Sequence, residues 1–138
     1  MGLYLCVFDD EETDLEGVDV GPYSEWNRFV DCVASTCEGG VEGSRYPLLT
    51  VHSDSDGECS ALEASVLLKG INEIRRRFDG YPCIPFESDW QRGIAKQFGI
   101  QPSSLAECFF DVDGENIFDR LGDVLSKAVE VCRPVSFQ

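Results

Sequence analysis

The chain of 138 residues carries 26 acidic and 11 basic residues, for a formal net charge of −15, and 43% of it is hydrophobic. This hydrophobic content excludes a disordered acidic tail, and the length predicts one domain, residues 1–138, with a core of its own. The charge disfavours binding to nucleic acid or to an anionic membrane. A basic protein is the natural complement, although a charge that serves only solubility fits the composition equally well.

Seven cysteines stand at positions 6, 32, 37, 59, 83, 108 and 132. Their number is odd and no C-x-x-C pair occurs, so reduced thiols in a cytosolic protein fit better than a disulfide framework. We expect Cys6 and Cys108 to be core thiols, and Cys37 and Cys59, at element ends, to react first. The first apolar run is too short for a signal peptide, and no run is long enough to span a bilayer.

Two apolar segments near the N-terminus predict a hairpin. Residues 3–8 are typical of a strand buried on both faces, and residues 18–20 alternate as a short edge strand does. Between them, residues 9–16 contain six acids and predict a solvated loop. A helix with Ser24 as its N-cap should follow, carrying one apolar stripe and ending at Gly39-Gly40.

The chain is organised around a strand, an acidic turn and a helix start. Residues 47–51 are short, apolar and β-branched, and predict a buried strand. Residues 52–58 place the only histidine beside three carboxylates. Ser60 and Glu63 form the pattern of a capping box, which predicts a helix that runs to about Phe78.

The C-terminal half repeats this design. Prolines make residues 82–86 an ordered loop, and a short helix follows from Ser88 to Gly99. Residues 105–110 predict a second strand, and residues 111–115 repeat the acidic turn. The last helix stops at Pro134, and residues 135–137 could add an edge strand. The order predicts the α+β class, with a single mixed β-sheet of about four to five strands and packed helices.

The first acidic turn partly resembles a calcium loop. With Gly57 at position six of an EF-hand loop, Asp54, Asp56 and Glu63 occupy positions three, five and twelve. Position one is then His52, a nitrogen donor in a hard-oxygen site, and Glu63 already has a capping role. A nucleophile is not indicated by Cys59 near His52, because no third group orients the pair. A glycosidase pair is not indicated by Glu58 with Asp54, because that chemistry needs two carboxylates at a fixed separation. We therefore expect no catalytic residues, no metal and no cofactor.

The chain resembles immunity protein 70, a family of bacterial immunity proteins from polymorphic toxin systems. The similarity rests on Gly2-Leu3-Tyr4-Leu5-Cys6-Val7-Phe8-Asp9, Gly43-Ser44-Arg45-Tyr46-Pro47, His52-Ser53-Asp54-Ser55-Asp56-Gly57-Glu58 and Glu107-Cys108-Phe109-Phe110-Asp111-Val112-Asp113-Gly114-Glu115. It implies a protein that blocks a cognate toxin in the cytosol by tight binding, without catalysis. Members often have a tryptophan after the first turn, where this chain has Cys59, and Trp90 would compensate.

The expected toxin-binding residues are the turn acids and one aromatic residue: Asp54, Asp56, Glu58, Asp111, Asp113, Glu115 and Trp90. If both turns leave parallel strands, their carboxylates form one rigid acidic rim that faces a basic toxin such as a nuclease. Trp90 is the candidate anchor because interfaces favour tryptophan, while core packing is the competing interpretation. The alternative function is a small metal-binding or calcium-responsive module that uses residues 52–63.

Overall fold

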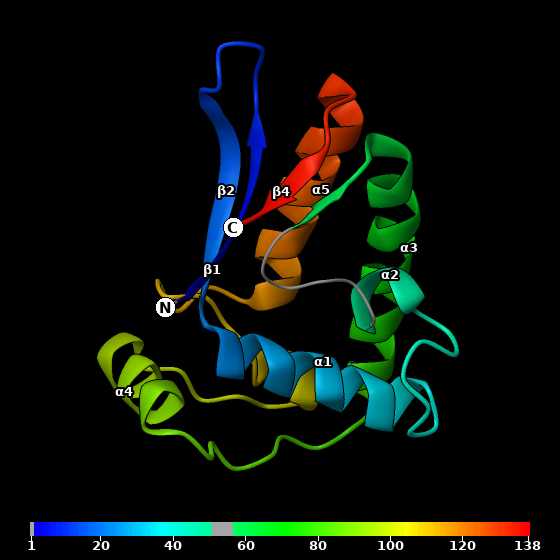
Figure 1. The fold of residues 1–138 in the computed structure, drawn as a ribbon. Helices are drawn as coiled ribbons and strands as arrows, with labels where there is room; N and C mark the ends of the chain where they lie inside the picture. Colours follow the sequence, from blue (N-terminus) through cyan, green and yellow to red (C-terminus); the bar gives the residue numbers. More distant parts are fainter. Residues whose placement is uncertain (1, 51–56) are drawn as a thin grey trace.

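One antiparallel sheet with helices packed against it makes up the described part of the chain, residues 2–50 and 57–138 of the computed structural model (Figure 1). The elements are β1 (Gly2–Phe8), β2 (Asp14–Pro22), α1 (Tyr23–Cys37), α2 (Pro47–Thr50), β3 (Gly57–Cys59), α3 (Ala61–Asp79), α4 (Asp89–Phe98), the 3-10 helix η1 (Leu105–Glu107), α5 (Ile117–Val131) and β4 (Val135–Phe137). The described strands are ordered β2-β1-β4-β3, and every neighbouring pair is antiparallel.

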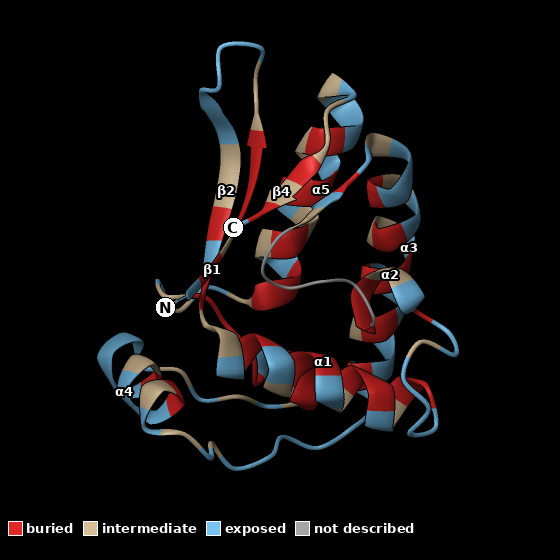
Figure 2. Ribbon diagram, viewed as in Figure 1, coloured by how far each residue is buried: buried red, intermediate tan, exposed pale blue. Residues whose placement is uncertain are grey.

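The core lies between one face of the sheet and the helices. Leu3, Leu5 and Val7 of β1 point to this side because alternate residues of a strand share a face, and they meet α5 and α3. Helix α1 crosses at the end of the sheet, where its buried stripe completes the core (Figure 2). Trp26 belongs to this buried stripe, since only 4% of it is exposed.

Four phenylalanine rings join the helices at the centre. They are Phe29 of α1, Phe78 of α3, Phe118 of α5 and Phe109 from the segment that follows η1. Their ring centroids lie 5.2 to 6.4 Å apart, mostly in edge-to-face geometry. Burying one such ring contributes about 2–3 kcal/mol, and the edge contacts add to this. This cluster fixes α1 against the rest of the molecule.

The expected hairpin of β1 and β2 is confirmed, and β2 is longer than residues 18–20. The expected C-terminal strand is also present, but β4 lies between β1 and β3 and is not an edge. Two other expected strands are wrong. Residues 47–50 form the short helix α2, in which Tyr46 O accepts bonds from the amides of Leu49 and Thr50. Residues 105–110 form η1 and an isolated bridge from Phe110 to Asn116.

Because residues 47–50 and 105–107 are helical, they add no strands to the sheet, and its described strands are all antiparallel. Both segments were expected to supply strands of a mixed sheet, in which they could lie parallel to each other. An apolar run of four to six residues buries its side chains equally well in a helical turn, as Leu49 and Leu105 do here. Pro47 also suits the first position of a helix, where no N–H is needed. The α+β class is therefore right, with four described strands and no parallel pair among them.

Helix ends follow the sequence signals closely. Ser60 caps α3 in a complete capping box: Glu63 N donates to Ser60 Oγ at 3.1 Å, and Ser60 N donates to Glu63 Oε1 at 3.0 Å. Ser88 caps α4, which ends at the left-handed Gly99. The start of α1 differs from the expectation, because Pro22 occupies the N-cap position instead of Ser24.

Candidate functional site

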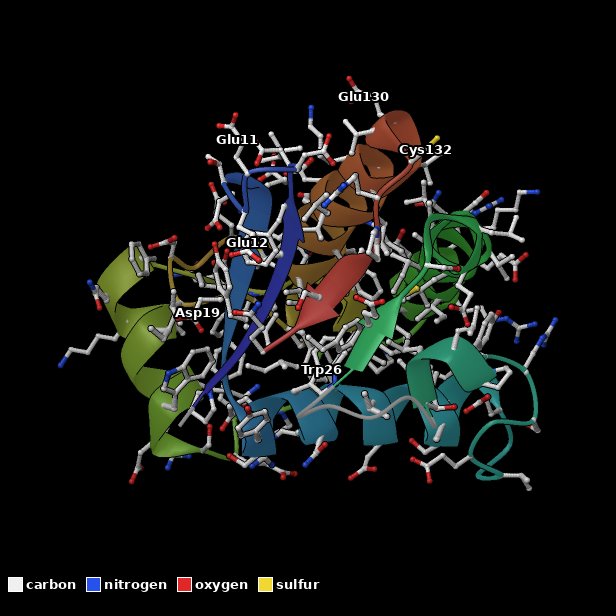
Figure 3. The ribbon with its side chains drawn as sticks, turned by 45° about the horizontal axis from the view of Figure 1, so that its top comes forward. Glu11, Glu12, Asp19, Trp26, Glu130 and Cys132 are labelled. Atoms are coloured by element: carbon white, nitrogen blue, oxygen red, sulfur yellow. The ribbon has the colours of Figure 1, made fainter. Side chains whose placement is uncertain are left out.

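The loop between β1 and β2 is an ordered turn that presents carboxylates to solvent. Asp9 Oδ1 accepts hydrogen bonds from Glu11 N and Thr13 N, each at 2.9 Å, and Asp9 N donates to Thr13 O at 2.9 Å. Glu11 and Glu12 lie at the exposed tip (Figure 3). One aspartate of the loop thus organises the backbone, and its neighbours carry the exposed charge.

Arg133 attaches this hairpin to the end of α5. Its Nε donates to Phe8 O at 3.0 Å, its Nη2 donates to Asp9 O at 3.1 Å, and its Nη1 pairs with Asp10. Glu130, one turn earlier, therefore lies at the same end of the molecule as Glu11 (Figure 3). The contacts are largely to backbone carbonyls, so they fix the path of the hairpin and leave its other carboxylates exposed.

Asp111 holds the second acidic turn together from inside. It is 2% exposed, and its Oδ1 accepts hydrogen bonds from Asp113 N and Glu115 N, each at 2.9 Å. Gly114 has φ +75, and the ring of Phe98 fills the space that a Cβ there would need. Asp113 and Glu115 are exposed. Of the three expected contact residues in this turn, Asp111 is a buried structural group, and the other two face solvent.

Arg120 gathers carboxylates from three segments. Its guanidinium nitrogens lie 3.0 Å from Asp123, 3.4 Å from Asp111 and from Glu115, and 3.6 Å from Glu16. Nη2 also donates to Gly17 O at 2.5 Å, at the outer edge of β2. Burial alone would lower the pKa of Arg120, but the surrounding carboxylates raise it above its ordinary value. Four carboxylates around one cation leave a local surplus of negative charge.

Together these groups form what we call the acidic edge, which follows β2 from the hairpin tip to the second turn. Its residues are Asp10, Glu11, Glu12, Asp14, Glu16, Asp113, Glu115 and Asp123. Val112 N donates to Asp19 O at 3.2 Å, which places the second turn against β2. Sequence reasoning missed the part that the hairpin contributes. The density of acids in residues 9–16 was visible in the sequence, but it predicted only a solvated loop and gave no sign of the hydrogen bonds that order it.

Glu58, the described carboxylate of the first acidic turn, lies at a different edge of the sheet from the second turn. The second turn adjoins β2, whereas the exposed Glu58 lies on β3, the edge strand on the opposite side. The expectation that Glu58 shares one rim with the second turn is therefore wrong, because it assumed two parallel strands, and the described strands are all antiparallel. Asp54 and Asp56 lie outside the described residues.

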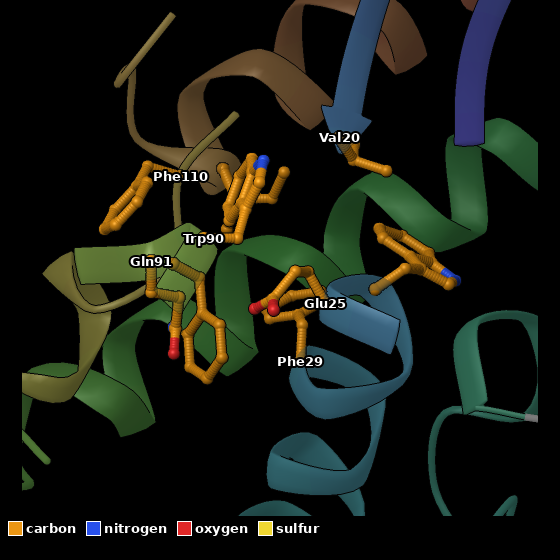
Figure 4. Close-up of a pocket in the computed structure, with 9 residues that line it drawn as sticks. Val20, Glu25, Phe29, Trp90, Gln91 and Phe110 are labelled. Atoms are coloured by element: carbon orange, nitrogen blue, oxygen red, sulfur yellow. The ribbon is translucent and has the colours of Figure 1, made fainter. Parts of the chain in front are cut away.

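Trp90 is half-buried and packs on its neighbours. Its indole stacks on Phe110 with ring centroids 6.0 Å apart (Figure 4). The indole also covers Gly21, where a Cβ would lie 2.6 Å from Trp90 Cζ2. Beside it, a pocket of about 20 Å³ contains Glu25, which is 8% exposed and lies 3.6 Å from Arg28 Nε. That volume holds one water molecule and no larger ligand. The indole thus has a packing role and a partly accessible surface.

The described residues contain few of the features that catalysis or metal binding needs. Cys59 is 1% exposed, and burial together with Glu63 raises its pKa to about 11, the reverse of an activated thiol. Within residues 2–50 and 57–138, no three potential metal ligands gather into a site. His52 lies outside these residues. No helix in the described part of the chain has the length and apolar character to cross a membrane.

Comparison with known proteins gives one match. A family model described as immunity protein 70 matches residues 3–137, which is nearly the whole chain. No curated protein and no solved structure matches. The family match therefore covers β1 through β4 and includes the hairpin, both turns and the helices between them.

Proposed function

The chain belongs to the immunity protein 70 family, and we propose that it binds and neutralises a cognate bacterial toxin domain by occlusion in the cytosol. The family match over residues 3–137 carries this proposal. The net charge of −15 supports a basic partner, such as a nuclease toxin. An occluding inhibitor needs a preformed surface and no reactive groups of its own, so we propose a function without catalysis.

The acidic edge supports the electrostatic part of the proposal. Asp9, Asp111, Arg120 and Arg133 fix the backbone around the exposed carboxylates, so little conformational entropy is lost when a partner binds. Exposed charges of this kind act mainly on the association rate and its salt dependence. Association with the toxin should therefore slow as ionic strength rises, because salt screens the attraction.

The test uses the toxin domain encoded beside this protein, in an inactivated form for binding and an active form for growth protection. The wild-type protein should bind it tightly and protect cells that express it. Two variants each remove two charges from the acidic edge: Glu11→Gln with Glu12→Gln, and Asp113→Asn with Glu115→Gln. The control, Glu42→Gln with Asp79→Asn, removes the same charge elsewhere.

Slower association at low salt in the acidic-edge variants, with the control unchanged, supports the acidic edge as the docking surface. Equal association rates in all variants would show that the acidic edge is not part of the interface. A wild-type protein that neither binds the toxin nor protects cells would contradict the proposed function. Asp54, Asp56, Glu58 and Trp90 remain proposed contacts. Substituting them singly in the same assay measures their contribution.

The metal-binding alternative has no supporting observation among the described residues. Glu63, which it would need as a ligand, accepts a hydrogen bond from Ser60 N at 3.0 Å. Calorimetry with Ca²⁺, Mg²⁺ and Zn²⁺ should show no micromolar binding. A micromolar site that disappears in the Asp54→Ala, Asp56→Ala double variant would establish the alternative.

A further inference from the structure

Residues 80–87, between α3 and α4, form an extended segment that the rest of the molecule holds in place. Leu105 N donates to Tyr81 O at 3.0 Å, Arg92 Nη1 donates to Phe86 O at 2.9 Å, and Gln91 Oε1 accepts from Glu87 N at 3.3 Å. Pro82 and Pro85 restrict the backbone further. The segment has no helix or strand, yet it is preorganised.

This segment runs alongside α1 (Figure 1), and a groove of about 520 Å³ lies between the two. Leu105 and Phe109 contribute apolar surface to it. The other lining residues are Arg28, Asp31, Cys32, Ser35, Thr36, Tyr81, Pro82, Ile84, Pro85, Glu87 and Gln91. Protein ligand sites are typically about 300–1,000 Å³, so the groove has room for a large side chain.

Two large apolar side chains of the segment remain in contact with solvent. Tyr81 is 47% exposed and Ile84 is 41% exposed, and both line the groove. A single exposed apolar residue is ordinary, but apolar residues that converge on a concave surface mark a binding site more often. The residues around them in the segment are also exposed (Figure 2).

The charges around the groove favour a cationic occupant. Arg28 is the one base among its lining residues, and its guanidinium already pairs with Glu87 at 2.6 Å and lies 3.6 Å from Glu25. Asp31 adds a third carboxylate, which is exposed on α1. Of these carboxylates Asp31 and Glu87 line the groove, whereas Glu25 is buried beside it, so the rim carries two negative charges against one arginine around an apolar interior.

We propose that this groove receives an apolar side chain carried on a lysine- or arginine-bearing segment of the toxin. The inference rests on the proposed function and specifies where short-range binding energy arises. A leucine or phenylalanine side chain would fill the groove, and an adjacent cation would lie near Asp31 and Glu87. The acidic edge, which follows β2, supplies the long-range attraction separately.

The central test is a double substitution, Tyr81→Ser with Ile84→Ser, and its matched control, Leu62→Ser with Val66→Ser. The control residues are 79% and 57% exposed on α3 and do not line this groove. Calorimetry with the inactivated toxin domain measures affinity. The groove variant should bind about 30-fold more weakly, as loss of interface anchors does. The control should stay within about 2-fold, and melting temperatures should confirm that both variants fold.

The contribution of the groove's negative charge is tested by Asp31→Lys. The control is Glu42→Lys, which changes the net charge of the protein by the same amount at a position outside the groove. Asp31→Lys should lower the affinity at least about 5-fold more than Glu42→Lys. If the wild-type protein binds and the groove variants match their controls, the groove inference is wrong and the proposed function stands. If the wild-type protein does not bind, both are wrong. A wild-type dimer that Tyr81→Ser with Ile84→Ser converts to monomer would show a second copy in the groove and overturn the inference.

Discussion

The acidic edge and the groove achieve order by different means. At the acidic edge, Arg120 and Arg133 bind backbone carbonyls and compensate part of a dense negative charge. At the groove, prolines and hydrogen bonds to the backbone hold apolar side chains in contact with solvent, beside a smaller surplus of negative charge. The first region suits long-range attraction, and the second suits short-range contact. In a strongly acidic protein, the electrostatic attraction that speeds association and the contacts that supply binding energy can thus lie on separate surfaces.

The largest expected effect concerns Asp111, on which the acidic edge depends. Asp111→Ala should lower the free energy of unfolding by about 3 kcal/mol, because it removes a buried carboxylate that accepts hydrogen bonds from two partly buried amides and pairs with Arg120. Urea denaturation measures the change. Asp113→Ala, in the same turn but exposed, should change it by less than about 0.5 kcal/mol. Equal effects would mean that Asp111 does not organise the turn.

A comparable carboxylate follows the C-terminal end of α1, the helix that forms one wall of the groove. Glu38 is 6% exposed and accepts hydrogen bonds from Tyr46 N at 2.7 Å, Arg45 N at 2.9 Å and Gly43 N at 3.2 Å. Burial alone would raise its pKa, but these amides stabilise the carboxylate and lower the pKa below its ordinary value. Glu38→Gln should cost about 2 kcal/mol at neutral pH.

The pH dependence follows from the direction of that shift. Because the pKa of Glu38 is lower in the folded state, its contribution is complete above the unfolded-state value of about 4.3. The contribution is lost as pH falls through the folded-state pKa. Denaturation curves of the wild-type protein and Glu38→Gln should therefore converge on acidification below about pH 4. A stability difference that stays constant between pH 7 and pH 3 contradicts this account.

Arg133 should control local order more than global stability. Arg133→Gln removes the contacts to Phe8 O and Asp9 O, at a cost of about 1 kcal/mol. The amides of residues 11 and 13 should then exchange with deuterium faster. Lys127→Gln, which removes only a surface pair with Glu130 at 3.3 Å, should leave that exchange unchanged. Unchanged exchange in Arg133→Gln would show that the hairpin orders itself.

The smallest effect is a difference in thiol labelling between the two regions. Cys37 and Cys59, which were expected to react first, are 5% and 1% exposed and should resist labelling, as should Cys6 and Cys108. The exposed thiols are Cys83, in the groove segment, and Cys132, beside Arg133.

Both exposed thiols should react with a neutral maleimide. With an anionic disulfide reagent at low salt, Cys132 should react about 2- to 5-fold more slowly than Cys83, because the acidic edge repels the reagent. Added salt should remove the difference. Mass spectrometry identifies the labelled cysteine, and rates that do not respond to salt would argue against a strong local field at the acidic edge.

The sequence predicted the structure correctly where a single residue determines the local backbone conformation. The complete capping box at Ser60, the cap at Ser88 and the left-handed Gly99 all occur where the sequence indicates them. Each requires only neighbours within four residues. Signals for strands were weaker. β1 was identified from its uninterrupted apolar run, whereas the run that begins at Pro47 and the run interrupted by Glu107 were assigned the wrong structure. The groove had no local signal, because residues 82–86 indicated only an ordered loop.

By itself, the sequence determined the α+β class, the caps of α3 and α4, the surplus of acid and the resemblance to immunity proteins, because these depend on composition and on contacts between close neighbours. The tertiary structure decided which acids matter. Asp111 and Asp113 are equivalent in the sequence pattern, yet the fold buries the first beneath two amides and leaves the second exposed. It also places β4 inside the sheet and brings α1 against residues 80–87. Burial and pairing between distant segments are properties of the packed chain.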